Sequence, residues 1–142
     1  MPSAPFVKFN DFVEQLGLKQ HDLNADPLFV YLSNEAPLAT DATRADIADL
    51  STAGGYTAGG ADTLNTASES PAGTMAVVGT DIVWTATAAG IGPFRYAILY
   101  NQVGGLASTN KLIGYWDYGS GVTLANGETF TVDFGATILT VT

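Results

Sequence analysis

Two runs of β-prone residues, 94–101 and 111–118, constrain the fold of this chain more than any other stretch. Together they hold four of the six tyrosines and one of the two tryptophans, and a polar connection containing glycine joins them. Successive side chains of a strand point to opposite faces, and here apolar or aromatic side chains fall on both faces of each run. A strand of this kind lies in the middle of a sandwich or beneath a partner subunit. The pattern therefore predicts a central hairpin over residues 94–118.

Aromatic residues of this hairpin and of the N-terminal region are candidates for an interface with another chain, because large aromatic side chains dominate the energetics of cores and interfaces. The candidate interface residues are Phe9, Phe12, Tyr96, Tyr100, Tyr115, Trp116 and Tyr118. A second interpretation remains open, in which four aromatic residues form a stacking platform for a sugar. Those four are Trp84, Tyr115, Trp116 and Tyr118.

The composition indicates one domain with partners. A chain of 142 residues is long enough to bury a true core without metal ions or disulfides. Hydrophobic residues make up 46% of the chain and charged residues only 13%, against a usual charged share of about a quarter. So few charges on a small domain indicate that other chains cover part of its surface.

The net charge argues against two classes of partner. Fourteen acidic residues against five basic ones give −9, whereas contacts to nucleic-acid phosphates need clustered Lys and Arg. Docking on anionic membranes needs basic residues too. No apolar run approaches the about 20 residues of a membrane span, and the N-terminal residues lack the pattern of a signal peptide. We therefore expect a soluble protein made in a cytoplasm, with no nucleic-acid or membrane partner.

The N-terminal region is predicted to form an extended arm and a short helix. Prolines keep residues 1–8 extended. Residues 9–17 have apolar side chains at helical spacing, Asn10 is a candidate cap, and Gly17 is a candidate end. The apolar positions are Phe9, Phe12, Val13 and Leu16. A helix of two turns cannot stand alone, so its Phe-rich face must pack either on the end of its own sandwich or on a neighbouring subunit.

The middle of the chain, residues 28–73, is predicted to contain a strand, a segment of ambiguous structure and a long loop. Residues 28–33 (LFVYLS) read as a strand, and residues 40–50 read as either a short helix or an irregular segment. Residues 51–73 are rich in Gly, Ala, Ser and Thr and are predicted to be a long loop, with a short strand possible near residues 61–67. A loop of this length in a compact domain is either mobile or lies along a partner.

Short strands are predicted for the rest of the chain, over residues 74–79, 82–88, 121–124, 128–134 and 137–142, in addition to the central hairpin. The Asn126-Gly127 pair is the strongest hairpin signal in the sequence and predicts that residues 121–124 and 128–134 pair with each other. Arg95 is the only charge in its strand and is expected to neutralise Asp117 in the facing strand. Residues 1–142 are thus predicted to form a single, mainly β domain, an antiparallel β-sandwich (Ig-like or jelly-roll) with one short N-terminal helix.

The sequence offers no familiar reactive site. It has no cysteine, no G-x-S-x-G motif and a single histidine, His21, which we interpret as a solvated surface residue. Asp22, Asn24 and Asp26 resemble the start of a calcium loop, but Pro27 follows at once and the later Gly and Glu of such a loop are missing. These residues are therefore predicted to form a turn. No catalytic, cofactor-binding or metal-binding residue is predicted, and no cofactor.

Two long stretches resemble a known family. One is FNDFVEQLGLKQHDL together with the following VYLSNEAP, and the other is IGPFRYAILYN together with KLIGYWDYGSGVTLANGETFTVDF. Both are similar to a widespread family of small, mostly uncharacterised proteins encoded in the structural gene clusters of tailed bacteriophages. The resemblance extends to residues 45–47 (ADI) and 55–60 (GYTAGG). It implies a component of the virion and carries no catalytic residue.

The resemblance and the composition lead to the same functional expectation. We expect a non-enzymatic structural protein of a tailed-phage virion, made in the host bacterial cytoplasm, and most specifically a capsid decoration (cement) protein that stabilises the head. Its expected partners are the major capsid protein or other virion proteins, and further copies of itself, with a trimer favoured. The alternatives are a neck or tail accessory protein, or a carbohydrate-binding module that aids host attachment by holding a surface polysaccharide.

Overall fold

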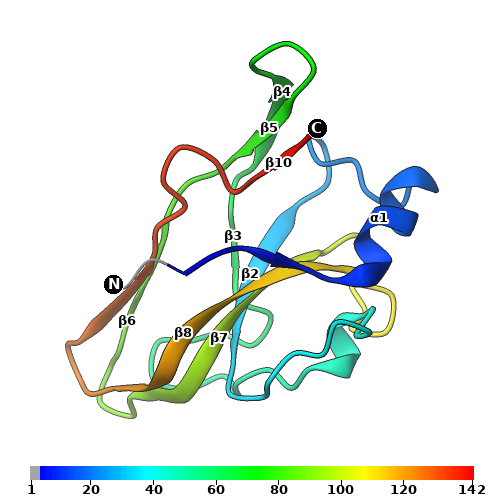
Figure 1. The fold of residues 1–142 in the computed structure, drawn as a ribbon. Helices are drawn as coiled ribbons and strands as arrows, with labels where there is room; N and C mark the ends of the chain where they lie inside the picture. The colour runs from blue at the N-terminus through cyan, green and yellow to red at the C-terminus, as the bar shows by residue number, and fades with distance from the viewer. Residues whose placement is uncertain (1–3) are drawn as a thin grey trace.

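The computed structural model describes residues 4–142, which form three antiparallel sheets, one α-helix and one short 3₁₀ helix (Figure 1). The helices are α1 (Asn10–Gly17) and η1 (Arg44–Asp46). The strands are β1 (Val7–Lys8), β2 (Leu28–Ser33), β3 (Ala61–Asp62), β4 (Thr66–Glu69), β5 (Met75–Val78), β6 (Ile82–Thr85), β7 (Ile91–Asn101), β8 (Leu112–Leu124), β9 (Thr129–Val132) and β10 (Leu139–Val141). The predicted mainly β, antiparallel fold with one short N-terminal α-helix is confirmed.

The largest sheet has the strand order β1-β8-β7-β2-β3. β2 lies inside it and pairs along its whole length with β7, from Leu28 opposite Asn101 to Ser33 opposite Tyr96. Five of the six residues of β2 are buried, as expected for a run that is apolar on both faces. A three-stranded sheet (β10-β5-β4) and a two-stranded sheet (β6-β9) complete a sandwich-like arrangement around this core.

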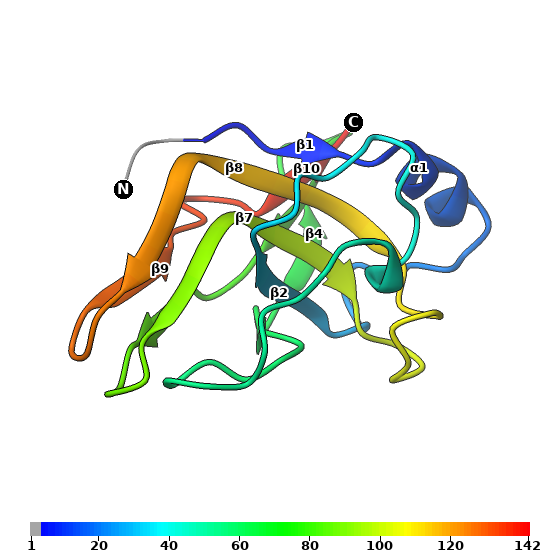
Figure 2. The same cartoon turned by 90° about the horizontal axis from the view of Figure 1, so that it is seen from below.

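The predicted central hairpin is present as β7 and β8, and it is longer than the sequence indicated. Figure 2 shows that both strands bend. The beginning of β7 and the end of β8 therefore turn toward β9. Between the pairs Tyr96–Asp117 and Phe94–Val122, β7 advances by two residues and β8 by five, so β8 carries three extra residues. An insertion of this kind bends a strand, and Gly119 within it has a φ of +98°. Residues 121–124, predicted as a separate strand, are the end of β8.

The Asn126-Gly127 pair forms a turn, but the predicted hairpin is wrong. The N–H of Glu128 donates to the carbonyl of Ala125 at 2.9 Å, which closes a β-turn. Only Gly127 has a positive φ, +87°, which fits a type II turn, whereas the type I′ turn of tight hairpins needs two such residues. The turn carries the chain from one sheet to another, because β9 pairs with β6 and not with β8.

The N-terminal segment lies along the edge of the largest sheet. Val7 and Lys8 pair with Tyr115 and Gly114 of β8, so this part of the predicted arm is a strand, while residues 1–3 of that arm lie outside the described residues. Helix α1 follows directly. Phe9 occupies the N-cap position that the sequence suggested for Asn10, and its N–H donates to a carbonyl of β8.

The segment 51–73 is only partly a loop, because it contains β3 and β4. Its first part is bound to the core by Tyr56, which is buried. The hydroxyl of Tyr56 donates to Asp49 Oδ1 at 2.6 Å and accepts the N–H of Leu32 at 3.0 Å. The preceding residues 40–50 are irregular apart from η1, in agreement with one of the two alternatives left open by the sequence.

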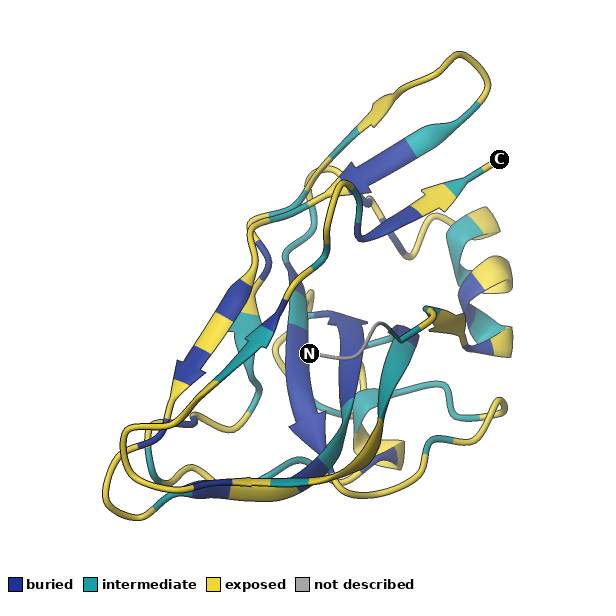
Figure 3. Ribbon diagram, turned by 60° about the vertical axis from the view of Figure 1, so that its left-hand side comes forward, coloured by how far each residue is buried: buried dark blue, intermediate teal, exposed yellow. Residues whose placement is uncertain are grey.

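The β4–β5 hairpin projects away from the rest of the molecule (Figures 1 and 3). Residues 68–73, which include its tip, are exposed, and only β10 pairs with it on the other side. The longest buried runs lie in β2 and in the parts of β7 and β8 that lie closest to it, at residues 97–101 and 112–114, and β5 also has a short buried segment (Figure 3). The core therefore supports the β7–β8 hairpin from its base.

Candidate functional site

The two faces of the β7–β8 hairpin carry the most distinctive surface of the described chain. Trp116 and Tyr115 are neighbours in β8 and point to opposite faces, as successive residues of a strand do. Each face forms one wall of a groove. We call the cavity of about 500 Å³ on the Trp116 side the inner groove, and the shallower one of about 410 Å³ on the Tyr115 side the outer groove.

The inner groove lies between the hairpin and the segment that begins with β9. It is lined by Ala4, Phe94, Arg95, Tyr96, Ala97, Trp116, Tyr118, Phe130, Val132, Asp133, Phe134, Gly135, Thr137 and Ile138. Its aromatic rings pack in a chain across the space between β8 and β9. The ring centres of Phe94 and Phe130 are 4.8 Å apart, those of Tyr118 and Phe130 5.5 Å, and those of Trp116 and Phe134 5.7 Å.

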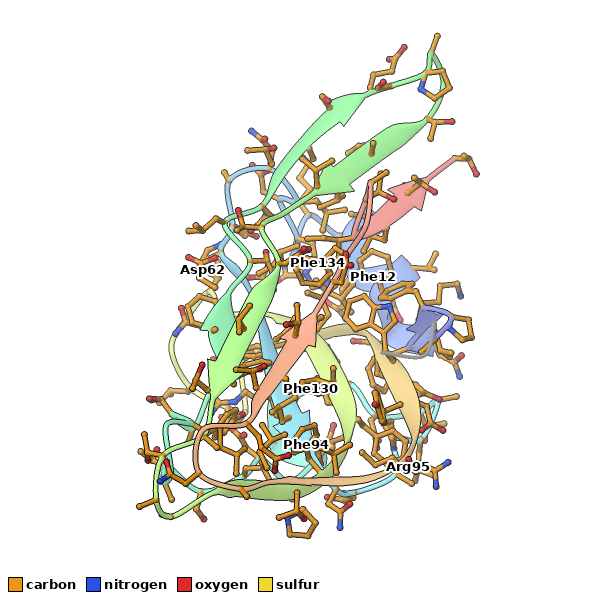
Figure 4. The ribbon with its side chains drawn as sticks, turned by 90° about the vertical axis from the view of Figure 1, so that its left-hand side faces the viewer. Phe12, Asp62, Phe94, Arg95, Phe130 and Phe134 are labelled. Atoms are coloured by element: carbon orange, nitrogen blue, oxygen red, sulfur yellow. The ribbon has the colours of Figure 1, made fainter. Side chains whose placement is uncertain are left out.

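Figure 4 shows Phe94 and Phe130 next to each other, with Phe134 farther along the groove. Phe94 is buried at the base, whereas Phe130, Phe134, Trp116 and Tyr118 are partly exposed. β8 and β9 are adjacent in the chain but belong to different sheets. Aromatic packing therefore takes the place of a hydrogen-bonded ladder between them.

An ion pair stands beside the grooves. Arg95 Nε lies 2.8 Å from Asp117 Oδ1 and its second nitrogen lies 3.0 Å from Oδ2, and both side chains are 40% exposed. This confirms the pairing predicted from the sequence. The guanidinium group also lies 5.4 Å from the ring centre of Tyr96, and Asp117 accepts the N–H of Gly119 at 2.8 Å.

These contacts shift the acid–base properties of both partners. The hydrogen bond from Arg95 lowers the pKa of the Asp117 carboxyl below its ordinary value. The same bond raises the pKa of Arg95. Both groups therefore remain charged at neutral pH, and each holds the other in one orientation.

The outer groove is lined by Pro5, Val7, Ala36, Pro37, Tyr96, Tyr115, Asp117 and Gly119. Val7 is 40% exposed there, and the ring of Tyr115 packs on the buried ring of Phe9 at 5.4 Å. This surface is mainly apolar and has little depth. It resembles a contact face more than a ligand pocket.

The seven candidate interface residues divide into two groups. Phe9, Phe12 and Tyr100 are 0%, 5% and 0% exposed, so they belong to the core of their own chain and are unavailable to a partner. Burial also raises the pKa of Tyr100 to about 12, and its hydroxyl donates to the carbonyl of Gly59 at 2.6 Å. The other four, Tyr96, Tyr115, Trp116 and Tyr118, are partly exposed on the hairpin.

The sugar platform suggested by the sequence does not form from the four residues named for it. Trp84 is 6% exposed and packs on Tyr56, with ring centres 5.7 Å apart. Tyr115 lies on the outer face. Trp116 and Tyr118 do share the inner groove, together with three phenylalanines that the sequence analysis did not associate with them. Those phenylalanines are Phe94, Phe130 and Phe134.

His21 is a buried residue, and its interpretation as a solvated surface histidine is wrong. It is 6% exposed, its Nδ1 lies 3.2 Å from Asn101 Nδ2, and its ring packs on Phe12 at 5.4 Å. Burial lowers the pKa of His21, although the nearby carboxylate of Asp26 opposes that shift. His21 lines neither groove.

The Asp22–Asp26 stretch forms the predicted turn. Asp22 Oδ1 accepts the N–H groups of Asn24 and Ala25, and Asp26 Oδ2 accepts the N–H of Asp22. Across residues 4–142, no three His, Cys, Asp or Glu side chains come together in a way that could hold a metal ion. Within the same residues, no helix is both long and apolar enough to cross a membrane.

Comparison of the chain with models of known protein families, with curated proteins and with solved structures finds no match in any of the three. The residues of the two grooves and the sequence resemblance are therefore the available basis for assigning a function.

Proposed function

We propose that this protein is a non-enzymatic structural component of a tailed-phage virion, and specifically a capsid decoration (cement) protein that binds the outside of the head. The observation that carries the proposal is the β7–β8 hairpin, which leaves aromatic side chains partly exposed on both of its faces. Aromatic residues are enriched at the centres of protein interfaces, where charged residues are depleted. The sequence resemblance to proteins of phage structural gene clusters supports the assignment to a phage virion.

The outer groove is the surface that we assign to the capsid. It combines partly exposed Tyr96 and Tyr115 with exposed Val7, and the β1 strand that carries Val7 is fixed to β8. A flat, apolar and pre-formed face can bind a protein surface without a large loss of conformational entropy. The net charge of −9 would keep decorated particles from adhering to anionic envelopes and to free DNA.

We also propose that the protein is a homo-oligomer, with a trimer as the favoured state. The low share of charged residues and the partly exposed aromatic side chains of the hairpin support this proposal. Light scattering of the purified protein at micromolar concentration measures its mass. A 14.7 kDa monomer that also fails to bind particles would rule out the oligomer.

Co-sedimentation tests the proposed function. Purified protein is mixed with emptied tailed-phage heads whose accessory proteins have been stripped away, with isolated tails, and with vesicles as a control. Saturable binding to heads alone is the expected result. Binding to tails alone would replace the decoration role with that of an accessory protein, and binding to neither heads nor tails would contradict a virion role.

A further inference from the structure

We propose that the inner groove is a binding site for a neutral oligosaccharide, in which Trp116 and Tyr118 stack on sugar rings while Arg95 and Asp133 bind hydroxyl groups. This site is distinct from the outer groove that we assign to the capsid, so the two proposals stand or fall separately. The inference rests on the geometry of the groove, on the state of its polar rim and on the charge of the molecule.

The first observation is that the aromatic side chains on the floor of the groove are not fully buried. Trp116 and Tyr118 come from the same face of β8 and remain partly exposed beside Phe130 and Phe134. A core aromatic side chain would normally be covered, and an exposed aromatic cluster on one wall of a cavity commonly marks a binding surface. Sugar rings have apolar C–H faces, which aromatic rings can cover.

The second observation is a polar rim in which Arg95 lines the groove, while its charge is balanced by Asp117 of the outer groove. Arg95 and Asp117 are paired at 2.8 and 3.0 Å, yet each side chain is 40% exposed. The pair therefore keeps hydrogen-bonding capacity at the edge of the groove. Sugar hydroxyl groups can accept hydrogen bonds from the exposed guanidinium group of Arg95.

Asp133 adds an acceptor on the opposite wall. It is exposed, and its Oδ1 accepts the N–H of Gly135 at 2.8 Å, which fixes the direction of the carboxylate. No hydrogen bond within residues 4–142 uses its Oδ2. Polar groups thus face the groove from both sides of the aromatic floor, as expected for a site that orients a ligand.

The third observation is electrostatic. Arg95 is the one cationic side chain that lines the groove in the described residues, and it is already paired, whereas Asp133 and the net charge of −9 disfavour an anionic ligand. A phosphate-bearing or uronic-acid ligand would find no free positive charge. A neutral glycan meets no such penalty.

The groove is also pre-formed and of suitable size. Its volume of about 500 Å³ falls within the usual range of ligand sites, roughly 300–1,000 Å³. The insertion in β8 that bends the hairpin lies directly after Asp117, and insertions of this kind are common next to binding sites because they redirect side chains. The hydrogen bond that the N–H of Gly119 donates to Asp117 Oδ1 stabilises that bend.

Tryptophan fluorescence tests the proposal with the full-length protein. The probes are cellohexaose, maltohexaose and mannohexaose as neutral glycans, with oligogalacturonate as the anionic comparison, each titrated into the millimolar range. We expect saturable quenching by at least one neutral probe, since Trp116 lines the groove while Trp84 is buried elsewhere. Isothermal titration calorimetry provides an independent measure of the same affinity.

Matched variants locate the site. Tyr118→Ala and Arg95→Gln should weaken binding by about tenfold or more, whereas Tyr115→Ala, which alters the neighbouring but opposite face, should leave the affinity unchanged within about twofold. Circular dichroism confirms that each variant is folded. A Tyr118→Phe variant keeps the ring if the alanine variant is unstable, and it should retain most of the affinity.

Several results would overturn the proposal. These are the absence of binding by every neutral probe, binding of oligogalacturonate alone, binding that Tyr118→Ala and Arg95→Gln leave unchanged, and loss of binding in Tyr115→Ala to the same extent. A dimer that dissociates in Tyr118→Ala would show that a second copy fills the groove, which also excludes the glycan. Capsid binding can persist in each of these cases, so the proposed function is tested separately.

Discussion

Arg95 on β7 and Asp117 on β8 form a two-point ion pair that joins the two grooves of the hairpin. Arg95 lines the inner groove and Asp117 lines the outer one. The ion pair therefore links the two faces of the hairpin. Asp117 also holds the N–H of Gly119, in the insertion that bends β8. A single interaction thus helps to define the shape of both surfaces.

The ion pair should matter more for shape than for stability. Both side chains are well exposed, and solvent screens such pairs, so we expect Asp117→Asn to lower the melting temperature only slightly. The effect should shrink further in high salt. Thermal melts at low and high ionic strength measure it, and the exchanged pair Arg95→Asp with Asp117→Arg should recover part of the loss. A large loss that salt does not change would contradict this account.

The hydroxyl of Tyr56 should contribute measurably to stability. Tyr56→Phe keeps the ring contact with Trp84 but leaves the buried N–H of Leu32 without its acceptor and removes the donor to Asp49 Oδ1. An unsatisfied buried polar group costs about 1–3 kcal/mol, which we expect as the loss in free energy of unfolding. Urea denaturation measures this quantity.

Tyr115→Phe is the matched control for that substitution. Tyr115 is partly exposed, and no hydrogen bond of its hydroxyl occurs within residues 4–142. Its loss should change the free energy of unfolding by less than about 0.5 kcal/mol. Equal effects of the two substitutions would show that the Tyr56 network does not hold the 51–60 segment to the core.

His21 should make the stability depend on pH in the weakly acidic range. Its pKa in the folded protein lies below the ordinary 6.5 because burial disfavours the charged form, an effect that Asp26 and Asp11 oppose and Lys111 assists. The unfolded chain therefore binds the proton more readily, and the free energy of unfolding should fall as the pH drops below about 6.5. Urea melts between about pH 7.5 and pH 5 measure the slope.

A His21→Asn variant isolates that contribution. Asparagine can retain an acceptor for Asn101 Nδ2 but does not titrate in this range. The variant should be less stable at neutral pH because it leaves a space beside Phe12, yet it should show a smaller slope. The carboxyl of Asp46, whose pKa is lowered by hydrogen bonds from the N–H groups of Thr43 and Ala42, contributes only below about pH 4. An unchanged slope in the variant would exclude His21 as the cause.

Phe12 and Val13 provide a test of how α1 packs. Phe12 is 5% exposed in the core, so Phe12→Ala should cost about 3–5 kcal/mol in the isolated protein and the same amount in the assembled one. Its neighbour Val13 is 57% exposed, so Val13→Ala should change stability by no more than about 0.5 kcal/mol. A Phe12→Ala cost that appears only after assembly would show that the helix packs on a neighbouring subunit.

The sequence was sufficient for features that depend on local periodicity. The two-residue period predicted the β7–β8 hairpin and led to the expected pairing of Arg95 with Asp117, although Asp117 lies directly opposite Tyr96 in the register. The helical spacing of Phe9, Phe12 and Leu16 predicted α1 to within one residue. Strand β2 was recognisable because the first five of its six residues, LFVYL, are apolar or aromatic and fall on both faces.

Features that depend on distant pairing were not predictable in the same way. The Asn126-Gly127 signal is local, but the partner of β9 is set by packing against β6, more than 40 residues earlier, so the inner groove was missed. His21 is buried because Asn101 and Phe12, from two other elements, close over it. The three extra residues of β8 leave no mark in a periodic pattern, and they determine the bend.

Particle binding by two matched valine variants tests the central claim most directly. Val7 lines the outer groove on β1, whereas Val83 is exposed on β6, and each can be changed to aspartate with the same change in charge. We measure the affinity of wild-type protein, Val7→Asp and Val83→Asp for stripped, emptied heads. The account predicts that wild-type protein and Val83→Asp bind alike, within about twofold, while Val7→Asp binds at least about tenfold more weakly. Wild-type affinity in Val7→Asp, or no binding of the wild-type protein to heads, would contradict it.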